Sequence, residues 1–532
     1  MSNWSLGSVA TAIEERLASW ESSQFGARIW AKDPTLWFPL ERSEIANRLG
    51  WLELPAYMAA RVAELESFVA EVTDVDHVVL LGMGGSSLAP EVFQQTLGGD
   101  KAELVLLDST HPRAVRAVHD RIDVARSLFL VASKSGGTLE TMSFFRYFWA
   151  ATGGDGSRFV AITDPGSSLE QIARERGFRR IFLAPSDVGG RYSALSVFGL
   201  VPAALIGVDV RRLVESALGM ATASAATVPV ADNPALRHGA VLGEFAEAGF
   251  DKLTYLVSPS LAAFPDWLEQ LVAESTGKDD VGIVPIAGES IGDPSVYGRD
   301  RLFVSYEYSG DDLVEHNRLV GTLERAGHTV VRFHLDDLHE LGAEMFRAEL
   351  AVAAAGSILG IHPFDQPDVQ LAKELAVRAM KGETSGEPVV EWAVDDVDRI
   401  EGGDFRPGDY FGIQAFLAPT ADNETALQAI RHSLRNRLRY ATTLGFGPRF
   451  LHSTGQLHKG GPNTGVFIQL IDEVVDDVEV PETDYTFGDL IAAQSWGDAQ
   501  ALVGRGRRLM RINHGEDTSV GLAKLERVIN NP

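Results

Sequence analysis

The sequence predicts an α/β protein built on parallel sheets, and three observations lead to this prediction. Short apolar runs recur along most of the chain. Candidate helices lie between these runs, and several runs end in turns rich in glycine, serine and threonine. Buried strands that alternate with helices form parallel sheets with helices packed on both faces. We therefore expect this fold class for the protein.

The composition limits what the protein can bind. Its 532 residues include 74 acidic and 47 basic side chains, a net charge of −27 that argues against nucleic acid and anionic membranes as partners. The sequence has no cysteine, which excludes disulfides, thiol catalysis and cysteine-ligated metals. The first residues lack the apolar segment of a signal peptide, and no apolar run approaches the roughly 20 residues of a membrane span. We expect a cytoplasmic protein.

The chain divides into four expected segments. Residues 1–75 have the apolar spacing of helices. Residues 76–225 and 226–380 are each expected to form one α/β domain, and residues 381–532 a smaller C-terminal αβ segment. Within that segment, residues 381–408 are polar and contain several glycines and prolines, so they are the best candidate for a linker.

Apolar runs mark the expected strands. They lie at 78–82, 104–108, 128–132, 159–163 and 180–184 in the first domain, at 251–258, 281–285, 301–306 and 330–333 in the second, and at 410–417 and 465–470 in the C-terminal segment. A helix is expected at 424–443, and further helices after the last strand. Arg431, Arg435 and Arg439 share one face of that helix, a pattern more typical of a salt-bridged surface than of a ligand site.

The stretch from Ser133 to Thr141 has the features of an anion site. A strand ends there in hydroxylated residues and two glycines, and a helix is expected to begin at Leu139. Free N–H groups and the helix dipole favour negative charge at such a position. The stretch carries one lysine, Lys134, but lacks the Gly-Lys-Ser/Thr ending of a nucleotide P-loop. It suits a small phosphomonoester, and the alternative is an ordinary polar turn.

The turn after the first strand resembles a dinucleotide fingerprint but departs from it. Gly82 and Gly84 have the required spacing, and Asp108 ends the next strand. The third glycine of the motif would fall at Ser87, whose side chain would prevent the helix from packing closely on the strand. We therefore do not expect a dinucleotide site.

Two charged residues, Arg191 and Glu274, lie near expected helix ends at positions that suit an active site. Arg191 follows two glycines before an apolar helix, where a cation opposes the helix dipole, so we expect it to point into a site rather than to solvent. Glu274 lies in the last turn of an expected helix, where the dipole favours the protonated acid and suits a general base. The alternatives are a surface arginine and a solvated acid.

Two further stretches carry candidate residues. Gln366 and Lys373 lie two turns apart on one helix face, which would also fit a solvated face. Residues 450–465 form an expected long loop with two histidines, His452 and His458, and a lysine. Neither histidine has a neighbouring carboxylate in the sequence, so an acid–base role fits better than metal binding. The alternative is a mobile surface loop.

Taken together, these motifs resemble phosphoglucose isomerase, and most closely the isomerase half of bacterial fusions of transaldolase with that enzyme. The resemblance covers about residues 76 to 513. Residues 1–75 are too short for a transaldolase barrel, so only the isomerase activity is implied. It rests on five motifs in order: Gly84-Gly-Ser-Ser87, Ser133-Lys-Ser-Gly-Gly-Thr138, Gly189-Gly-Arg-Tyr-Ser193, Glu274-Ser-Thr-Gly-Lys278, and Phe364-Asp-Gln366 with Lys373.

The resemblance implies two sugar-isomerase domains, no cofactor or metal, and a homodimer whose subunits share active sites. Glu274 would move the proton between C1 and C2 of the sugar, and Arg191 would steady the enediolate. The phosphate and the sugar would be bound by Gly84, Gly85, Ser86, Ser133, Lys134, Ser135, Thr138, Gln366 and Lys373.

One motif of the family is missing. Members usually carry Gly-Gln-His after the base, but no histidine lies between Glu274 and His316 here. The nearest match, Gly455-Gln-Leu-His458, lies downstream of the lysine helix and is one residue longer. By resemblance His458 would open the sugar ring, with His316 as the alternative.

The implied activity is the reversible isomerisation of glucose 6-phosphate and fructose 6-phosphate through a cis-enediolate. A non-catalytic sugar-phosphate sensor would keep the phosphate loop without needing Glu274, Arg191 and Lys373 together. A glutamine-dependent sugar aminotransferase would need a cysteine nucleophile, which the chain lacks. Mannose 6-phosphate is left open as an additional substrate.

Overall fold

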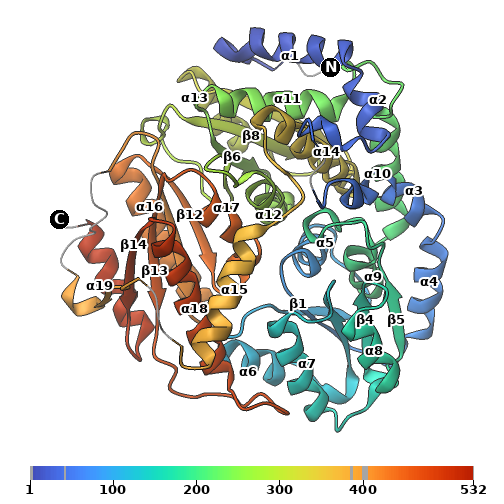
Figure 1. Cartoon of the computed structure of the whole chain (residues 1–532), viewed down its shortest axis with the longest axis vertical. Helices are drawn as coiled ribbons and strands as arrows, with labels where there is room; N and C mark the ends of the chain where they lie inside the picture. The colour runs from blue at the N-terminus through green and yellow to red at the C-terminus, as the bar shows by residue number, and fades with distance from the viewer. Residues whose placement is uncertain (1–3, 41–42, 384–386, 398–404, 531–532) are drawn as a thin grey trace.

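The computed structural model describes residues 4–40, 43–383, 387–397 and 405–530. Three parallel sheets, each with helices packed around it, form three units that meet near the centre of the molecule (Figure 1). The α/β fold with parallel sheets is therefore confirmed. No helix among the described residues is long and apolar enough to cross a membrane.

The N-terminal segment is helical, as expected. Its helices are α1 (Ala10–Ser22), α2 (Phe25–Trp30), α3 (Leu54–Ala59) and α4 (Val62–Glu71). They bury apolar residues such as Trp20, Met58 and Leu65 against the first and second units. This segment therefore covers the outside of both units rather than forming a separate core.

The first unit has a five-stranded sheet in the order β2-β1-β3-β4-β5. Its strands are β1 (His77–Gly82), β2 (Glu103–Leu107), β3 (Ser127–Ala132), β4 (Phe159–Thr163) and β5 (Arg180–Leu183). Its helices are α5 (Leu88–Leu97), α6 (Pro112–Arg121), α7 (Leu139–Ala151), α8 (Ser168–Glu175) and α9 (Val197–Leu205). All five strands lie where apolar runs predicted them, because a strand covered on both faces is apolar along its whole length.

The second unit has a four-stranded sheet in the order β7-β6-β8-β9. Its strands are β6 (Lys252–Val257), β7 (Val284–Ile286), β8 (Arg301–Tyr308) and β9 (Val330–Leu335). Its helices are α10 (Val210–Ala223), α11 (Pro234–Glu247), α12 (Phe264–Thr276), α13 (Val314–Arg325) and α14 (Leu341–Leu359). Helix α14 is almost wholly buried between α10, α11 and α12. Helix α15 (Pro367–Met380) then leads toward the C-terminal unit (Figure 1).

The C-terminal unit has a five-stranded sheet in the order β10-β14-β13-β11-β12, as many strands as the first. Its strands are β10 (Glu391–Ala393), β11 (Tyr410–Phe416), β12 (Ala441–Phe446), β13 (Gly465–Ile471) and β14 (Arg508–Asn513). Its helices are α16 (Ala421–Leu438), α17 (Gly455–Gly460), α18 (Phe487–Gly504) and α19 (Thr518–Asn530). Helix α18 packs along α15 and so fixes this unit against the second one.

Three strands of this unit differ from the sequence expectations. The helix expected at 424–443 ends at Leu438, because Arg439 adopts a left-handed backbone with φ of 62° and β12 follows. Residues 508–513 form β14 instead of a helix and pair with β13. β10 lies inside the expected linker 381–408, of which residues 384–386 and 398–404 are outside the described residues.

The interpretation of the arginine face of α16 as a salt-bridged surface is wrong for two of its three residues. Arg431 and Arg435 are buried, whereas Arg439 is exposed. Arg431 donates to the carbonyl of Thr442 at 2.7 Å, and Arg435 pairs with Glu289 of the second unit at 3.0 Å. The face therefore joins two units.

Candidate active site

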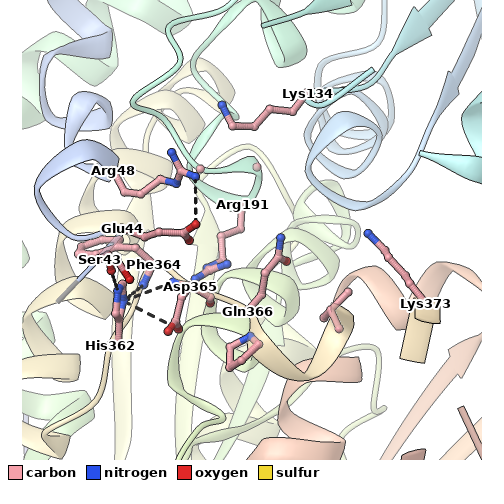
Figure 2. Close-up of a pocket in the computed structure, with 14 residues that line it drawn as sticks. Ser43, Glu44, Arg48, Lys134, Arg191, His362, Phe364, Asp365, Gln366 and Lys373 are labelled. Carbon is pink, nitrogen blue, oxygen red and sulfur yellow. Dashed lines mark hydrogen bonds and ion pairs between the residues drawn. The ribbon is translucent and has the colours of Figure 1, made fainter. Parts of the chain in front are cut away.

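The candidate site lies where loops of all three units meet. A cavity of about 600 Å³ is lined by Lys134, Arg191, Gln366 and Lys373 among others (Figure 2). A second cavity of about 320 Å³ is lined by Ser135, Gly137, Thr138, Glu140, Leu451, His452 and Gln494. Val369 and Lys373 line both cavities, so the two adjoin each other across α15.

The hydroxylated stretch forms a tight loop between β3 and α7. The hydroxyl oxygens of Ser133 and Thr138 lie 2.9 Å apart, and the Gly136 N–H donates to Ser133 Oγ at 3.1 Å. Gly136 has a φ of 73°, which glycine adopts without strain. Within the described chain, no side-chain hydrogen bond caps the first turn of α7 at Thr138. Its N–H groups are therefore available to an anion in the second cavity.

Lys134 does not point into that second cavity. Its ammonium group pairs with Asp164 and donates to the carbonyl of Ser186 at 3.3 Å. It lines the larger cavity instead, on the side opposite Gln366 (Figure 2). The structure thus divides the predicted phosphate-binding residues between two adjoining cavities, with Ser135 and Thr138 on one side and Lys134 on the other.

The glycines after β1 allow two other loops, one of them from the C-terminal unit, to approach this turn closely. A Cβ atom at Gly85 would lie 2.1 Å from the carbonyl oxygen of Gly190, just before Arg191. A Cβ atom at Gly84, whose φ is 54°, would lie 2.7 Å from the carbonyl oxygen of His452. A side chain at either position would force these loops apart. The turn that holds Gly84, Gly85 and Ser86 is therefore a meeting point of the first and C-terminal units.

Glu274 and Arg191 form a buried ion pair. Arg191 Nη1 lies 3.1 Å from Glu274 Oε1, and the two side chains are 3% and 7% exposed. Gln270 Nε2 donates to Glu274 Oε2 at 3.1 Å. Arg191 also donates to Ser275 Oγ at 2.8 Å and to the carbonyl of Pro363 at 2.6 Å. Helix α12 and the loop before α15 therefore hold both charged groups in fixed positions.

Gln366 and Lys373 lie about two turns apart at the start of α15. Gln366 is the residue before the helix, Pro367 begins it, and both line the larger cavity with Lys373. The neighbouring Lys278 is buried and pairs with Asp365 at 3.0 Å. Burial, together with the nearby Arg191, lowers the pKa of Lys278 to about 7. The cationic groups of the motifs thus gather around one cavity.

His458 and His316 line neither of these two cavities. His458 is buried in α17 against Phe467, with ring centroids 4.8 Å apart, and its Nδ1 lies 3.1 Å from Gln414 Nε2. Burial lowers the pKa of His458 well below its usual value. His316 is buried in the second unit, where its Nε2 lies 2.8 Å from Ser305 Oγ.

The sequence predicted an acid–base role for His452 but no role for its polar neighbours in the second cavity, Glu140 and Gln494. His452 Nε2 lies 2.9 Å from Glu140 Oε1, and Gln494 Nε2 donates to the same oxygen at 2.7 Å. The only local signals were the two histidines in one glycine-rich loop and an acidic residue in the first turn of α7. His452 and Glu140 are 312 positions apart in the chain, so no spacing rule could pair them.

Comparisons with known proteins show which proteins this chain is similar to. A model of the phosphoglucose isomerase family matches residues 63–291. A probable glucose-6-phosphate isomerase of Haloarcula marismortui is 27% identical over 404 residues, which cover 69% of this chain and 91% of that protein. A glucose-6-phosphate isomerase of Parabacteroides distasonis is 29% identical over 385 residues, covering 61% of this chain and 85% of that protein.

Solved structures agree with the fold. A hypothetical protein from Thermus thermophilus superposes with a TM-score of 0.61 at 25% identity, covering 70% of this chain and 98% of that one. A glucose-6-phosphate isomerase from Chlamydia trachomatis has a TM-score of 0.54 at 21% identity, covering 68% of this chain and 79% of that one, and shows the fold alone.

The parallel-sheet fold and a buried carboxylate–arginine pair beside a hydroxylated loop define the class of this protein as an α/β isomerase. Within that class, the chain is similar to the phosphoglucose isomerase family, whose model matches residues 63–291. The resemblance of its motifs to that family is therefore confirmed.

Proposed function

We propose that the protein interconverts glucose 6-phosphate and fructose 6-phosphate by ring opening and proton transfer through a cis-enediolate. The observation that carries this proposal is the buried Glu274–Arg191 pair next to the cavity lined by Gln366 and Lys373. Relatives that match most of their length to this chain are named glucose-6-phosphate isomerases.

The proton transfer follows from the position of Glu274. Arg191 and Gln270 each contact one of its carboxylate oxygens, so the group is held in one orientation. A carboxylate fixed in this way removes a proton from C2 of the open-chain sugar and returns it to C1 without moving. The negative charge that develops on the enediolate oxygens is stabilised by the guanidinium group of Arg191.

Substrate binding falls to the surrounding loops. The hydroxyl groups of Ser135 and Thr138 and the N–H groups at the start of α7 suit the phosphate group. Gln366 and Lys373 offer an amide and a cation to the hydroxyl groups of the sugar. We propose no metal or cofactor, because proton transfer next to a carbonyl group needs only a base and a cation in place.

The test replaces the base without changing its shape. Glu274→Gln should lower turnover by about 10²–10⁴-fold, the usual cost of losing a general base. Inhibition by inorganic phosphate should change little, because the phosphate contacts are untouched. Turnover would be measured in a coupled assay for glucose 6-phosphate formed from fructose 6-phosphate.

Glu269→Gln is the matched control on the same helix. Burial, together with Asp266, raises the pKa of Glu269 to about 8, so this side chain is already mostly neutral at pH 7. It lines a different cavity, and the substitution should leave turnover unchanged. Wild-type turnover in Glu274→Gln would remove Glu274 from the mechanism, whereas absence of turnover in the parent protein would favour a sugar-phosphate-binding regulator.

A further inference from the structure

The larger cavity has one wall with a buried cation behind it. This wall is the loop between α14 and α15, and its lining residues are His362, Phe364, Asp365 and Gln366. The cation is Lys278, which follows α12, has a side chain that is 3% exposed and lines neither of the two cavities. Burying an ammonium group is costly, so its contacts indicate what it does there.

Two cations hold this loop from two different units. Arg191 of the first unit donates to the carbonyl oxygens of Pro363 and Asp365, at 2.6 and 3.0 Å. Lys278 of the second unit donates to the carbonyl oxygen of His362 and pairs with the Asp365 carboxylate at 3.0 Å. Three carbonyl groups of one short loop therefore face buried cations, which fixes the path of the loop.

The turn that carries Lys278 has an unfavourable backbone. Lys278 and Val281 form a β-bridge in which each N–H donates to the carbonyl of the other at 2.9 Å. Asp279 and Asp280 between them have φ of 54° and 60°, a conformation that glycine or asparagine usually supplies in such a turn. The Asp280 N–H donates to the carbonyl of Gly460 in α17 at 3.0 Å. The chain thus tolerates local strain where it holds Lys278 against the loop.

The charges of this region balance only while Lys278 keeps its proton. Arg191 pairs with Glu274, the proposed base, and Lys278 pairs with Asp365. A neutral Lys278 would leave the Asp365 carboxylate without its cation. Arg191, which already contacts the backbone of Asp365, would then lie between two carboxylates. Its guanidinium group would offer less positive potential to the enediolate.

From these contacts we propose that Lys278 is a positioning residue for the isomerisation. Its ammonium group holds the loop before α15 and compensates Asp365, so the charge of Arg191 remains available to the enediolate. This positioning role rests on the proposed function. The loss of Lys278 should therefore act on kcat through Arg191 and leave the phosphate contacts of the second cavity unchanged.

The first experiment removes the charge of Lys278 and keeps the length of its side chain. Lys278→Met should lower kcat by about 10²-fold, the loss that a small misplacement of catalytic groups can cause. The KM for fructose 6-phosphate and the inhibition constant of inorganic phosphate should stay near the parent values, because Ser135 and Thr138 line the other cavity. A parent-like kcat in Lys278→Met would overturn the positioning role.

Lys252→Met is the matched control in the same unit. Lys252 is buried, pairs with Asp251 at 2.7 Å and lines neither cavity. This substitution should lower the free energy of unfolding but leave kcat per folded molecule unchanged. Urea unfolding of both variants separates a loss of folded protein from a loss of kcat. If both variants lose kcat per folded molecule equally, Lys278 has no special relation to the site.

The second experiment removes the partner charge as well. In the double variant Lys278→Met, Asp365→Asn the uncompensated carboxylate is gone, so Arg191 faces Glu274 alone. The double variant should regain about tenfold of the kcat lost in Lys278→Met, a usual size for coupling between contacting charged groups. If it is no faster than Lys278→Met, compensation of Asp365 is not what Lys278 contributes, and the positioning role fails.

The proton of Lys278 gives a third readout. The groups that face its ammonium are Arg191, Glu274, His362 and Asp365. Burial and Arg191 lower the pKa of Lys278 to about 7, while Asp365 and Glu274 act in the opposite direction. Burial also lowers the pKa of His362, so this ring is uncharged when Lys278 loses its proton.

The kcat of the parent should therefore fall as the pH rises through about 7, because deprotonation of Lys278 leaves Asp365 uncompensated. The double variant, which buries no unpaired charge, has no such proton to lose and should not follow this fall. A parallel fall in both proteins would overturn the positioning role. If the parent isomerises neither sugar phosphate, the proposed function fails and this role fails with it. An active parent with a parent-like kcat in Lys278→Met overturns the role of Lys278 alone.

Discussion

The cleft formed by the two adjoining cavities and the interior of the C-terminal unit both contain buried charged groups, but only those of the cleft border the candidate site. In the cleft, Arg191 and His452 border cavities that a small molecule can enter. In the C-terminal unit, Lys459 and Asp498 pair at almost no exposure, and Gln469 donates to Asp498. The two regions therefore share the same residue types and differ in whether their polar groups border the cavities of the candidate site.

His452 and His458 differ in the same way, although both lie in residues 450–465 of the C-terminal unit. His452 is 12% exposed at its side chain and has Glu140 as a partner. His458 packs between Phe450 and Phe467 next to Gln414, and its Nε2 is buried without a hydrogen-bond partner in the described structure. The environment of His458 favours a neutral ring in a packed core.

The largest expected effect on stability comes from the buried ion pair of the C-terminal unit. Lys459→Met should lower the free energy of unfolding by about 3–5 kcal/mol, because it leaves the Asp498 carboxylate buried without its cation. Urea unfolding would measure this. Turnover per folded molecule should change far less than in Glu274→Gln.

Arg318→Met provides the matched comparison for that experiment. Its partner Glu315 lies one turn away on α13, and both side chains are more than half exposed. This substitution should leave the unfolding midpoint nearly unchanged. If the two variants unfold alike, the buried pair of the C-terminal unit is not a structural element.

A smaller effect is expected at the start of α7, on the side of the cleft. Thr138→Ala should raise both the KM for the sugar phosphate and the inhibition constant of inorganic phosphate by about tenfold or more, since hydrogen bonds to charged groups contribute about 1.5–3 kcal/mol. Thr138 lines the second cavity. Inhibition titrations with phosphate would give both values.

Thr152→Ala tests the other end of the same helix. The hydroxyl of Thr152 donates to the carbonyl of Trp149 at 3.0 Å, away from both cavities. Its loss should leave phosphate inhibition as in the parent. Equal inhibition of the parent and Thr138→Ala would place the phosphate elsewhere, and Lys134 in the larger cavity would be the next variant to examine.

Features fixed by local sequence could be predicted, whereas features that depend on packing between the three units could not. The phosphate loop was predictable because strand, small residues and helix start follow one another within a dozen positions, so local chemistry fixes the structure. The five strands of the first unit were predictable because each contains a run of three or more apolar residues. The pairing of Glu140 with His452 depends on how three units pack, and no local pattern encodes it.

The errors in the C-terminal unit have a similar origin. The turn at Arg439 carries no glycine or proline, so no helix-ending signal predicted that α16 stops before β12. The burial of Arg431 follows from its contact with Thr442, which lies on that unexpected strand. The role of His458 was inferred from a motif and stays a prediction, whereas its apolar neighbours come together only in the folded unit.

The smallest effect concerns His238, a third histidine, in the second unit. It packs on Phe333 with ring centroids 4.8 Å apart, and neither ring nitrogen has a hydrogen-bond partner in the described part of the chain. Burial, together with Arg347, lowers the pKa of His238 from 6.5 to about 3. Between these values the unfolded chain binds the proton and the folded chain does not, so stability falls as the pH drops from 6.5 toward 3.

His238→Gln should reduce this slope by up to about 1.4 kcal/mol per pH unit, measured by urea unfolding at several pH values. His452→Asn is the comparison, because His452 has a carboxylate partner and borders a cavity. If His238→Gln keeps the parent's slope between pH 6.5 and 3, this imidazole is not held neutral by the fold.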